Sequence, residues 1–146
     1  METDEEIIDS PTGWVAKHIR SYVESGGAKG TKFSGHDLLL LTTRGRKSGK
    51  LRRTALFYGQ DGGRYVLVAS NGGAARHPFW YLNLLEEPEV IVQVGAEVFK
   101  ARARPATDEE TPALWQIMVG IFAQYESYRK KARRNIPVVV VERTAV

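Results

Sequence analysis

The stretch that decides the fold is DLLLLTTRGRKSGKLRRTALFYGQDGGRYVLVAS, residues 37–70. Its first seven residues form a short apolar run that ends at two threonines, which predicts a buried strand. A glycine-punctuated basic turn follows over 44–50, and residues 51–59 predict a second strand. Asp61-Gly62-Gly63 is a strong signal for a hairpin into a third strand over 64–70. The sequence therefore predicts a meander of strands.

A helix precedes this meander in the sequence. It is expected between the start signal Ser10-Pro11-Thr12 and the terminator Gly26-Gly27. Its apolar positions recur at helical spacing: Trp14, Val15, His18, Ile19 and Tyr22.

Further elements follow the meander. A Gly-rich loop at 71–73 leads to a short helix from Phe79 to Leu85, and a hairpin across Gly95-Ala96 joins strands over 90–94 and 97–104. Thr107 and Glu110 fit a capping box for a helix whose apolar positions are Leu114, Ile117, Met118, Ile121, Phe122 and Tyr125. Residues 137–142 form a β-branched closing strand. Because strands and helices do not alternate, we expect a small α+β barrel and not a parallel α/β sheet.

Composition excludes several classes of protein. The chain has 146 residues, 42% of them hydrophobic and 26% charged, which is typical of one globular domain. It has no cysteine, so disulfides, thiolate metal sites, iron–sulfur clusters and cysteine nucleophiles are excluded. No apolar run reaches the roughly 20 residues of a membrane span, and METDEEIIDS lacks the features of a signal peptide. We therefore expect a cytoplasmic protein.

The net charge of +4 is unevenly distributed. Residues 1–10 carry five acids and no base, whereas residues 11–146 carry 21 basic and 12 acidic side chains. We expect the acidic stretch 1–10 to fray and residues 11–146 to form one domain. A basic body indicates an anionic partner: nucleic acid, an anionic membrane surface or a phosphorylated small molecule.

The basic turn is the most informative segment. Its six cations, with no acid between them, are Arg44, Arg46, Lys47, Lys50, Arg52 and Arg53. Together with Ser48 and backbone amides they could hold phosphate or carboxylate, or they could form only a solvated hairpin tip. The spacings of a P-loop and of a Rossmann fingerprint are both absent. A second basic run at 129–134 has no nucleic-acid-binding motif beside it, so nucleic acid is not favoured.

Two other segments have candidate ligand-binding groups. Ser70, Asn71, Trp80 and Asn83 cluster around a loop that follows a strand, an arrangement suited to a flat heteroaromatic ligand. Tyr125 and Tyr128 share one helix face, and the Tyr125 phenol is a candidate proton donor, although core packing explains it equally well. The three histidines lack metal-ligand spacing, so no metal site is expected.

Four stretches together resemble the deazaflavin-dependent nitroreductase family of actinobacteria. They are LLTTRGRKSG at 40–49, RRTAL at 52–56, VASNGG at 68–73 and PFWYLNL at 78–84. The resemblance runs from about residue 12 to the end of the chain. It implies a split β-barrel, similar to FMN-binding barrels, of six or seven mainly antiparallel strands with flanking helices. It also implies coenzyme F420, an 8-hydroxy-5-deazaflavin, as the cofactor.

The resemblance also implies roles for residues of this chain. Arg46, Lys47 and Ser48 would meet the anionic tail of the cofactor. The next part of the site would be lined by Arg52, Arg53, Thr54, Ala55, Leu56 and Phe57. The ring and ribityl chain would be held by Val68, Ala69, Ser70, Asn71, Phe79, Trp80, Tyr81, Leu82 and Asn83. Tyr125 would face the substrate, whereas Phe57 and Phe122 stand where some relatives carry tyrosine.

The implied reaction is hydride transfer from reduced F420 to a small, hydrophobic, electron-poor acceptor. Conjugated enones, unsaturated lactones such as coumarin-like compounds, quinones and nitroaromatics all fit, and Tyr125 or water would supply a proton. An FMN-dependent reductase of the same fold and a non-catalytic deazaflavin carrier are the alternatives. Neither nucleic acid nor a membrane is indicated as a partner, and either a monomer or a homodimer is expected.

Overall fold

The computed structural model describes residues 5–11 and 13–144 and has an α+β architecture. Its helices are α1 (Gly13–Glu24), α2 (Phe79–Glu86), α3 (Thr111–Ile121) and α4 (Gln124–Ala132), with a short 3₁₀ helix η1 (Asn71–Gly73). Its strands are β1 (Ile7–Asp9), β2 (Lys32–Phe33), β3 (His36–Arg44), β4 (Leu51–Phe57), β5 (Gly59–Asp61), β6 (Arg64–Val68), β7 (Glu89–Val94), β8 (Glu97–Pro105) and β9 (Val138–Arg143).

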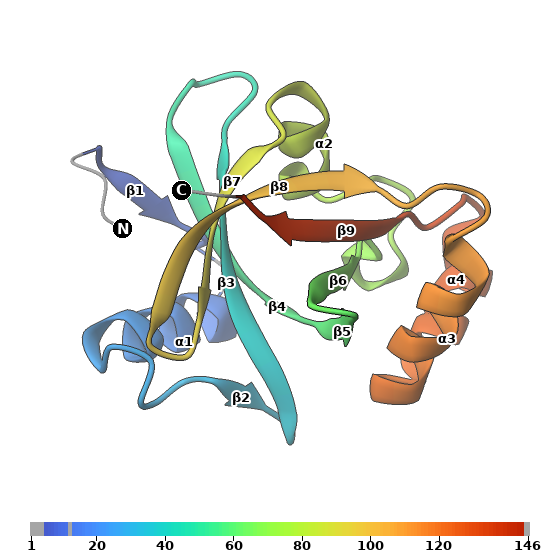
Figure 1. Cartoon of the computed structure of the whole chain (residues 1–146), viewed down its shortest axis with the longest axis horizontal. Coiled ribbons are helices and arrows are strands. Elements are labelled where there is room, and N and C mark those ends of the chain that lie inside the picture. The colour runs from blue at the N-terminus through green and yellow to red at the C-terminus, as the bar shows by residue number, and fades with distance from the viewer. Residues whose placement is uncertain (1–4, 12, 145–146) are drawn as a thin grey trace.

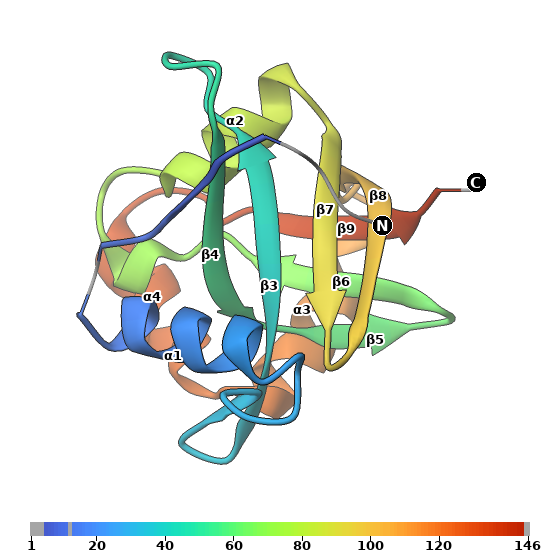
Figure 2. The same cartoon turned by 90° about the vertical axis from the view of Figure 1, so that its left-hand side faces the viewer.

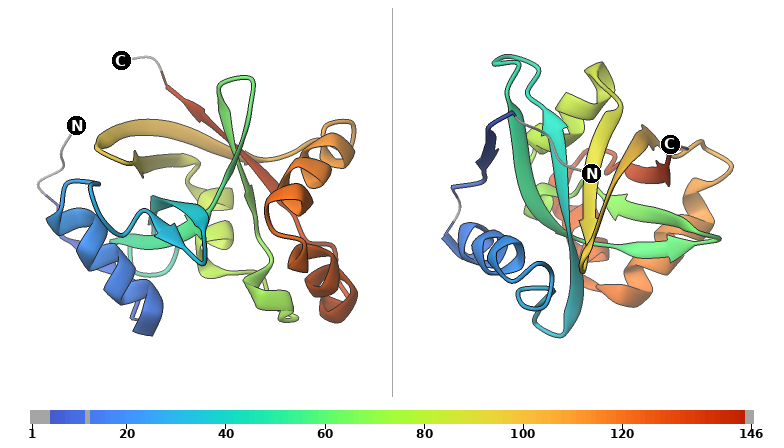
Figure 3. Two further views of the ribbon diagram at one scale, coloured as in Figure 1. Left: turned by 90° about the horizontal axis from the view of Figure 1, so that it is seen from below. Right: turned by 60° about the vertical axis from the view of Figure 1, so that its left-hand side comes forward.

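These strands form one curled, mainly antiparallel sheet in the order β1-β4-β3-β7-β8-β9-β6-β5, with β2 added beside β3. Helix α1 and the pair α3–α4 lie on opposite sides of this sheet, and α2 lies beside the β3–β4 turn (Figures 1 and 2). The view from below shows the same separation of α1 from α3–α4 (Figure 3). None of the helices in the described ranges is both long and apolar enough to cross a membrane.

The unbroken apolar run of β3 is explained by burial on both faces. Leu38 and Leu40 pack with Ile19 and Tyr22 of α1. Leu39 and Leu41 pack on the other face with Leu84 and other residues of the inner cluster. A strand covered on both faces reads as a continuous hydrophobic run, because neither set of alternate positions meets water.

The valine-rich strand β9 is buried in the same way. Val138 and Val140 pack against α3 and α4, whereas Val139 and Val141 face the inner cluster. This arrangement fixes the position of α4 next to the loop that follows β6, and that loop is a candidate part of the site.

The structure has more strands than the six or seven that the sequence predicts. The additional strands include β1, which pairs in parallel with the first three residues of β4, and the two-residue β2. The prediction that residues 1–10 fray is therefore corrected for Ile7–Asp9. Acidic composition indicated disorder, but the partner strand supplies hydrogen bonds and counter-charges that the segment alone does not reveal.

The predicted helix through Tyr125 also differs from the structure. The two reciprocal hydrogen bonds of the capping box are present: the Thr107 amide donates to Glu110 (2.9 Å) and the Glu110 amide donates to the Thr107 hydroxyl (3.2 Å). Helix α3 itself begins after this turn, at Thr111, with Glu110 as its N-cap residue. The helix then breaks at Phe122, whose backbone is extended (φ −142°, ψ 95°), and α4 begins at Gln124. Helical spacing of apolar residues continues across this break, so periodicity did not reveal it. The helix-start residue Thr12 lies outside the described residues.

Candidate functional site

The basic turn is a tight, well-bonded connection between β3 and β4. The Gly45 amide donates to the Lys50 carbonyl and the Gly49 amide donates to the Gly45 carbonyl, both at 2.8 Å. Gly49 has a φ of +73°, and a Cβ at Gly45 would lie 2.7 Å from the Ser48 hydroxyl. The glycines therefore allow the compact turn that leaves 46–50 exposed at one end of the molecule.

The six cations of this segment fall into two groups. Arg44 pairs with Glu5 (2.8 Å) and Arg53 pairs with Asp9 (2.6 Å), so the acidic segment beside β4 neutralises both. The other four are exposed and have no carboxylate partner among the residues that the structure describes: Arg46, Lys47, Lys50 and Arg52. The positive charge that remains for an anionic ligand is therefore concentrated at the tip of the turn.

Asn83 joins this turn to α2. Its side-chain carbonyl accepts from the Arg46 amide (3.1 Å), and its amide group donates to the Thr43 hydroxyl (3.0 Å). Asn83 and Thr43 are both buried. The predicted ligand-contacting side chain is thus used inside the protein, where it fixes the start of the turn against the helix.

The six predicted residues of β4 do not share one face, because successive side chains of a strand point to opposite faces. Leu56 packs against the inner cluster, and Arg52 and Thr54 share its side of the strand. Ala55 and Phe57 pack on the α1 side, which is also the side of Arg53. The side chains of 52–57 therefore divide between two environments, and their shared role in lining the cofactor site stays a prediction.

The segment 68–71 is divided in a similar way. Val68 packs with α3 and α4, whereas Ala69 belongs to the inner cluster. Ser70 is buried. Asn71 has a φ of +50°, and its amide group donates to the Arg76 carbonyl (3.1 Å), which closes the loop. Asn71 therefore shapes the loop in this structure, instead of presenting a free amide.

The predicted residues of α2 range from exposed to buried. Phe79 is 75% exposed and is the most accessible large apolar side chain of the described residues. Trp80 and Leu82 are partly buried against the inner cluster, and Tyr81 is buried with its ring centroid 4.9 Å from that of His77. Phe79 and Trp80 thus leave ring surface beside the loop that a flat ligand could cover.

Sequence analysis missed the residue that holds this loop in place, Arg134. Its guanidinium donates to the backbone carbonyls of Ala69, Ser70, Ala74, Arg76 and Asn135, at 3.0–3.3 Å. Nη1 also lies 3.0 Å from His77 Nδ1. The only sequence signal was its place in the basic run 129–134, which does not distinguish it from its neighbours.

His77 is held neutral in this arrangement. Because a guanidinium nitrogen can only donate, Nδ1 accepts and the ring proton resides on Nε2. Burial and the nearby charge of Arg134 both lower the pKa of His77. The loop from 69 to 77 is therefore fixed by one cation without a carboxylate counter-ion among the described residues.

Tyr125 is buried among aromatic side chains of α3 and α4. Its ring centroid lies 5.1 Å from Phe122 and 6.4 Å from both Trp115 and Tyr128. Burial raises the pKa of its hydroxyl, which has no hydrogen-bond partner among the described residues. The phenol therefore stays protonated at neutral pH, and its raised pKa makes it a weaker acid than an exposed tyrosine.

An aromatic row connects Tyr125 to the sheet. Phe122 lies 5.1 Å from Phe57, and the His36 ring lies 5.1 Å from Phe57 and 5.6 Å from Phe122. The break between α3 and α4 brings Phe122 to this position. The two phenylalanines that stand where some relatives carry tyrosine are thus in ring contact.

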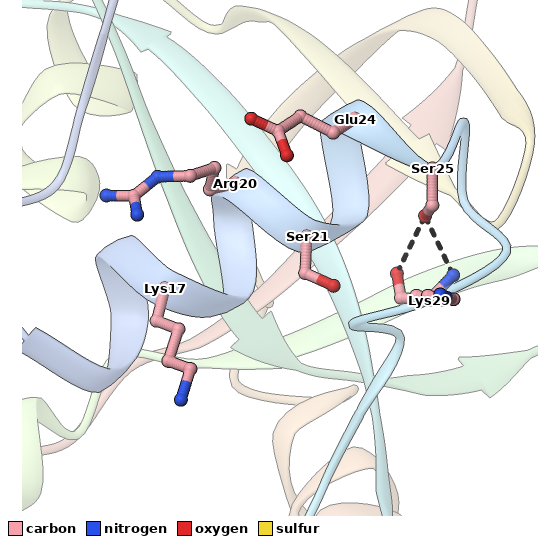
Figure 4. A pocket seen from close by; sticks show the side chains of 6 residues that line it. All are labelled: Lys17, Arg20, Ser21, Glu24, Ser25 and Lys29. Atoms are coloured by element: carbon pink, nitrogen blue, oxygen red, sulfur yellow. Dashed lines mark hydrogen bonds between the residues drawn. The ribbon is translucent and has the colours of Figure 1, made fainter.

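A separate depression of about 430 Å³ lies on the outer side of α1, lined by Lys17, Arg20, Ser21, Glu24, Ser25 and Lys29 (Figure 4). The Lys29 amide donates to the Ser25 hydroxyl at 2.8 Å there. None of the predicted site residues lines it. No cluster of three or more metal-ligating side chains occurs in 5–11 and 13–144.

The chain is similar to F420-dependent reductases over most of its length. A family model described as F420H(2)-dependent quinone reductase matches residues 14–143. An F420H(2)-dependent quinone reductase of Mycobacterium tuberculosis is 43% identical over 108 residues, which cover 72% of each chain. A second, putative one from the same species is 37% identical over 103 residues, covering 70% of this chain and 87% of that protein.

Solved structures agree with this relationship. An F420-H2 dependent reductase called FDR-A superposes with a TM-score of 0.67 at 40% identity, covering 72% of this chain and 93% of that one. A structure described as a domain-swapped dimer superposes with a TM-score of 0.70 at 38% identity, covering 91% of this chain and all of that one.

Proposed function

The chain belongs to the F420H(2)-dependent quinone reductase family, and from this membership we propose that it is an oxidoreductase that uses reduced coenzyme F420. The resemblance recognised in the sequence and the family match agree on this cofactor. The acceptors we propose are small, flat and electron-poor. Quinones come first, because they are what the named relatives reduce; enones, unsaturated lactones and nitroaromatics follow as further candidates.

The observation that supports the proposal is the group of four unpaired cations at the tip of the β3–β4 turn. A deazaflavin cofactor with a phosphate and an oligoglutamate tail carries several negative charges. Arg46, Lys47, Lys50 and Arg52 offer charge-assisted donors without a competing carboxylate, and Ser48 adds a hydroxyl. The donor set therefore fits the group.

The loop at 69–77 and α2 would hold the other end of the cofactor. Phe79 and Trp80 supply ring surface, and Asn83 fixes the turn and the helix relative to one another. When bound, reduced F420 supplies a hydride to the acceptor; the protein contributes binding, orientation and electrostatics. Phe57 and Phe122 would form an apolar wall for the acceptor ring.

Tyr125 is our proposed source of the proton that completes the reduction. Its contact with Phe122 supports this role, because it places the hydroxyl-bearing ring at the aromatic row. Tyr125→Phe should lower kcat by about 10²–10⁴-fold while F420 affinity stays unchanged, since only the hydroxyl is lost. If water donates the proton, the variant will keep nearly full turnover, with the same solvent isotope effect as the parent protein.

The proposed function is tested with purified protein, F420H2 and a quinone such as menadione. Each turnover should oxidise one F420H2 and convert one quinone, which gains a hydride and a proton, to its hydroquinone. Parallel assays with FMN and a reduced nicotinamide test the flavin alternative. Binding of F420, followed by its fluorescence, without turnover of any acceptor would favour a carrier instead.

Three further proposals concern the whole molecule. The curled sheet is, in our interpretation, a split β-barrel, and residues 11–146 form one deazaflavin-binding domain. We propose a cytoplasmic protein that acts on small molecules and not on nucleic acid; contact with a membrane is not indicated. A monomer and a homodimer both remain consistent with the fold, and a relative described as a domain-swapped dimer makes the homodimer the first to test.

A further inference from the structure

Arg134 belongs neither to the basic turn that would bind the cofactor tail nor to the aromatic row. Its guanidinium nevertheless contacts several residues of the loop 69–77. It is half-buried and follows Arg133, whose left-handed backbone (φ +55°) ends α4. The guanidinium has no carboxylate partner within the described ranges; its partners are the five carbonyls and His77 Nδ1. Such a set of neutral acceptors is unusual for an arginine that serves only to solubilise a surface.

The carbonyl contacts also determine where the loop amides point. In a trans peptide the C=O and the following N–H point in opposite directions. The carbonyls of Ala69, Ser70, Ala74 and Arg76 point at the guanidinium, so the next amide in each case points away from it. None of these four amides donates to another described residue: Ser70, Asn71, Ala75 and His77.

We propose that Arg134 is a positioning residue that gathers the carbonyls of the loop 69–77 and thereby presents its amides as donors to a ligand edge rich in hydrogen-bond acceptors. This inference rests on the proposed function, because the ligand edge it names is the acceptor-bearing ring edge of the deazaflavin. The chemistry required of the ligand is carbonyl oxygens or unprotonated ring nitrogens, and no charge.

A close contact with α4 supports a fixed loop at this position. Gly73 has a φ of +81°, and a Cβ there would lie 3.1 Å from the Tyr128 Cα, so η1 is pressed closely against α4. Arg134 is therefore anchored by the end of the same helix that the loop touches. Without the guanidinium, the carbonyls of Ala69 and Ala74 would lose their donor among the described residues. The carbonyls of Ser70 and Arg76 would each keep one other donor, the Gly73 amide and the Asn71 side chain.

The matched variants are Arg134→Met, Arg134→Lys and Lys130→Met. Lys130 belongs to the same basic run, is exposed, and its side chain makes no hydrogen bond or ion pair with the described residues, so its loss removes one charge without breaking a bond to the loop. Arg134→Lys keeps the charge but replaces the planar fork of five N–H groups by a single ammonium.

Two measurements are made on each variant: hydrogen exchange of the loop amides without cofactor, and F420 affinity by fluorescence titration. Arg134→Met should speed exchange over 69–77 and weaken F420 binding by about tenfold, the loss expected when one or two neutral hydrogen bonds from the loop amides are misplaced. KM for F420H2 should rise with it, while kcat at saturation changes less. The exchange rates and the F420 affinity of Arg134→Lys should lie between those of the parent protein and Arg134→Met. Both quantities should be the same in Lys130→Met as in the parent protein.

Three results would overturn the inference. The first is an equal F420 affinity in Arg134→Met and Lys130→Met, and the second is an Arg134→Lys variant with the parent's loop exchange and F420 affinity. The third is an Arg134→Met variant that is less stable globally but has unchanged exchange of the loop amides. If Arg134→Met does not fold, the comparison of Arg134→Lys with Lys130→Met decides by the same criteria. If the parent protein binds no F420, the proposed function is wrong. The hydrogen exchange of the loop amides then tests by itself whether Arg134 positions the loop.

Discussion

Two basic runs that look alike in the sequence have different partners in the structure. In the turn 44–53, acids of the N-terminal segment pair with Arg44 and Arg53 and leave four cations exposed at the tip. In the run 129–134, Arg129 pairs with Glu126 and lies 5.0 Å from the Trp115 ring, whereas Arg134 is bound by backbone carbonyls. The comparison teaches that charge density along a sequence does not determine how much charge a ligand can reach.

The largest expected difference between the two runs is in cofactor affinity. Arg46→Ala and Lys47→Ala should each weaken F420 binding by about 10–100-fold, because each removes a charge-assisted contact to the anionic tail. Lys130→Ala and Lys131→Ala should change it by less than about twofold. Fluorescence titrations at two salt concentrations measure this, and the parent's affinity should fall with added salt.

Equal losses from both pairs of variants would contradict the assignment of the tail to the turn. They would indicate a long-range effect of net charge instead.

A smaller effect is expected from the side chain that fixes the turn. Asn83→Ala should lower the free energy of unfolding by about 1–3 kcal/mol, because it leaves the buried Thr43 hydroxyl and the Arg46 amide without partners. Denaturant unfolding measures the loss, and Glu86→Ala at the exposed end of α2 is the control. An unchanged midpoint would mean that the turn holds its position without the helix.

Removing an acid of the N-terminal segment should raise F420 affinity, whereas removing a cation of the turn lowers it. Asp9→Asn frees Arg53 from its ion pair and adds net positive charge beside the turn, so F420 affinity should rise by about two- to fivefold at low salt. The gain should disappear at high salt. A loss of affinity would show that β1 supports the site and does not compete with it for charge.

The smallest effect concerns the pH dependence of the loop held by Arg134. Because the pKa of His77 is lowered from its ordinary value of 6.5, the unfolded state binds its proton first as the pH falls. The stability that His77 contributes is therefore present above pH 6.5 and is lost as the pH falls through its lower folded-state pKa. Because intrinsic amide exchange itself slows as the pH falls, the quantity to measure is the protection factor over 69–77. It should decrease in that window in the parent protein and stay constant in His77→Gln.

The sequence by itself determined the strands of the central meander, the Gly95 hairpin, the capping box and the family. Local rules suffice for these features, because hairpin turns, caps and apolar runs depend on residues close together in the chain. The glycine-punctuated cation cluster likewise indicated an anionic ligand from residue types alone.

Only the tertiary structure decided which of those groups remain free for a ligand. The partners of Arg44 and Arg53 lie 39 and 44 residues away, those of Asn83 lie 37 and 40 away, and the farthest carbonyl on Arg134 is 65 residues away. The break at Phe122 was hidden because apolar spacing continues through it. Hydrogen bonds and ion pairs act over a few ångströms of space, so their partners are fixed by how the sheet curls and not by distance along the chain.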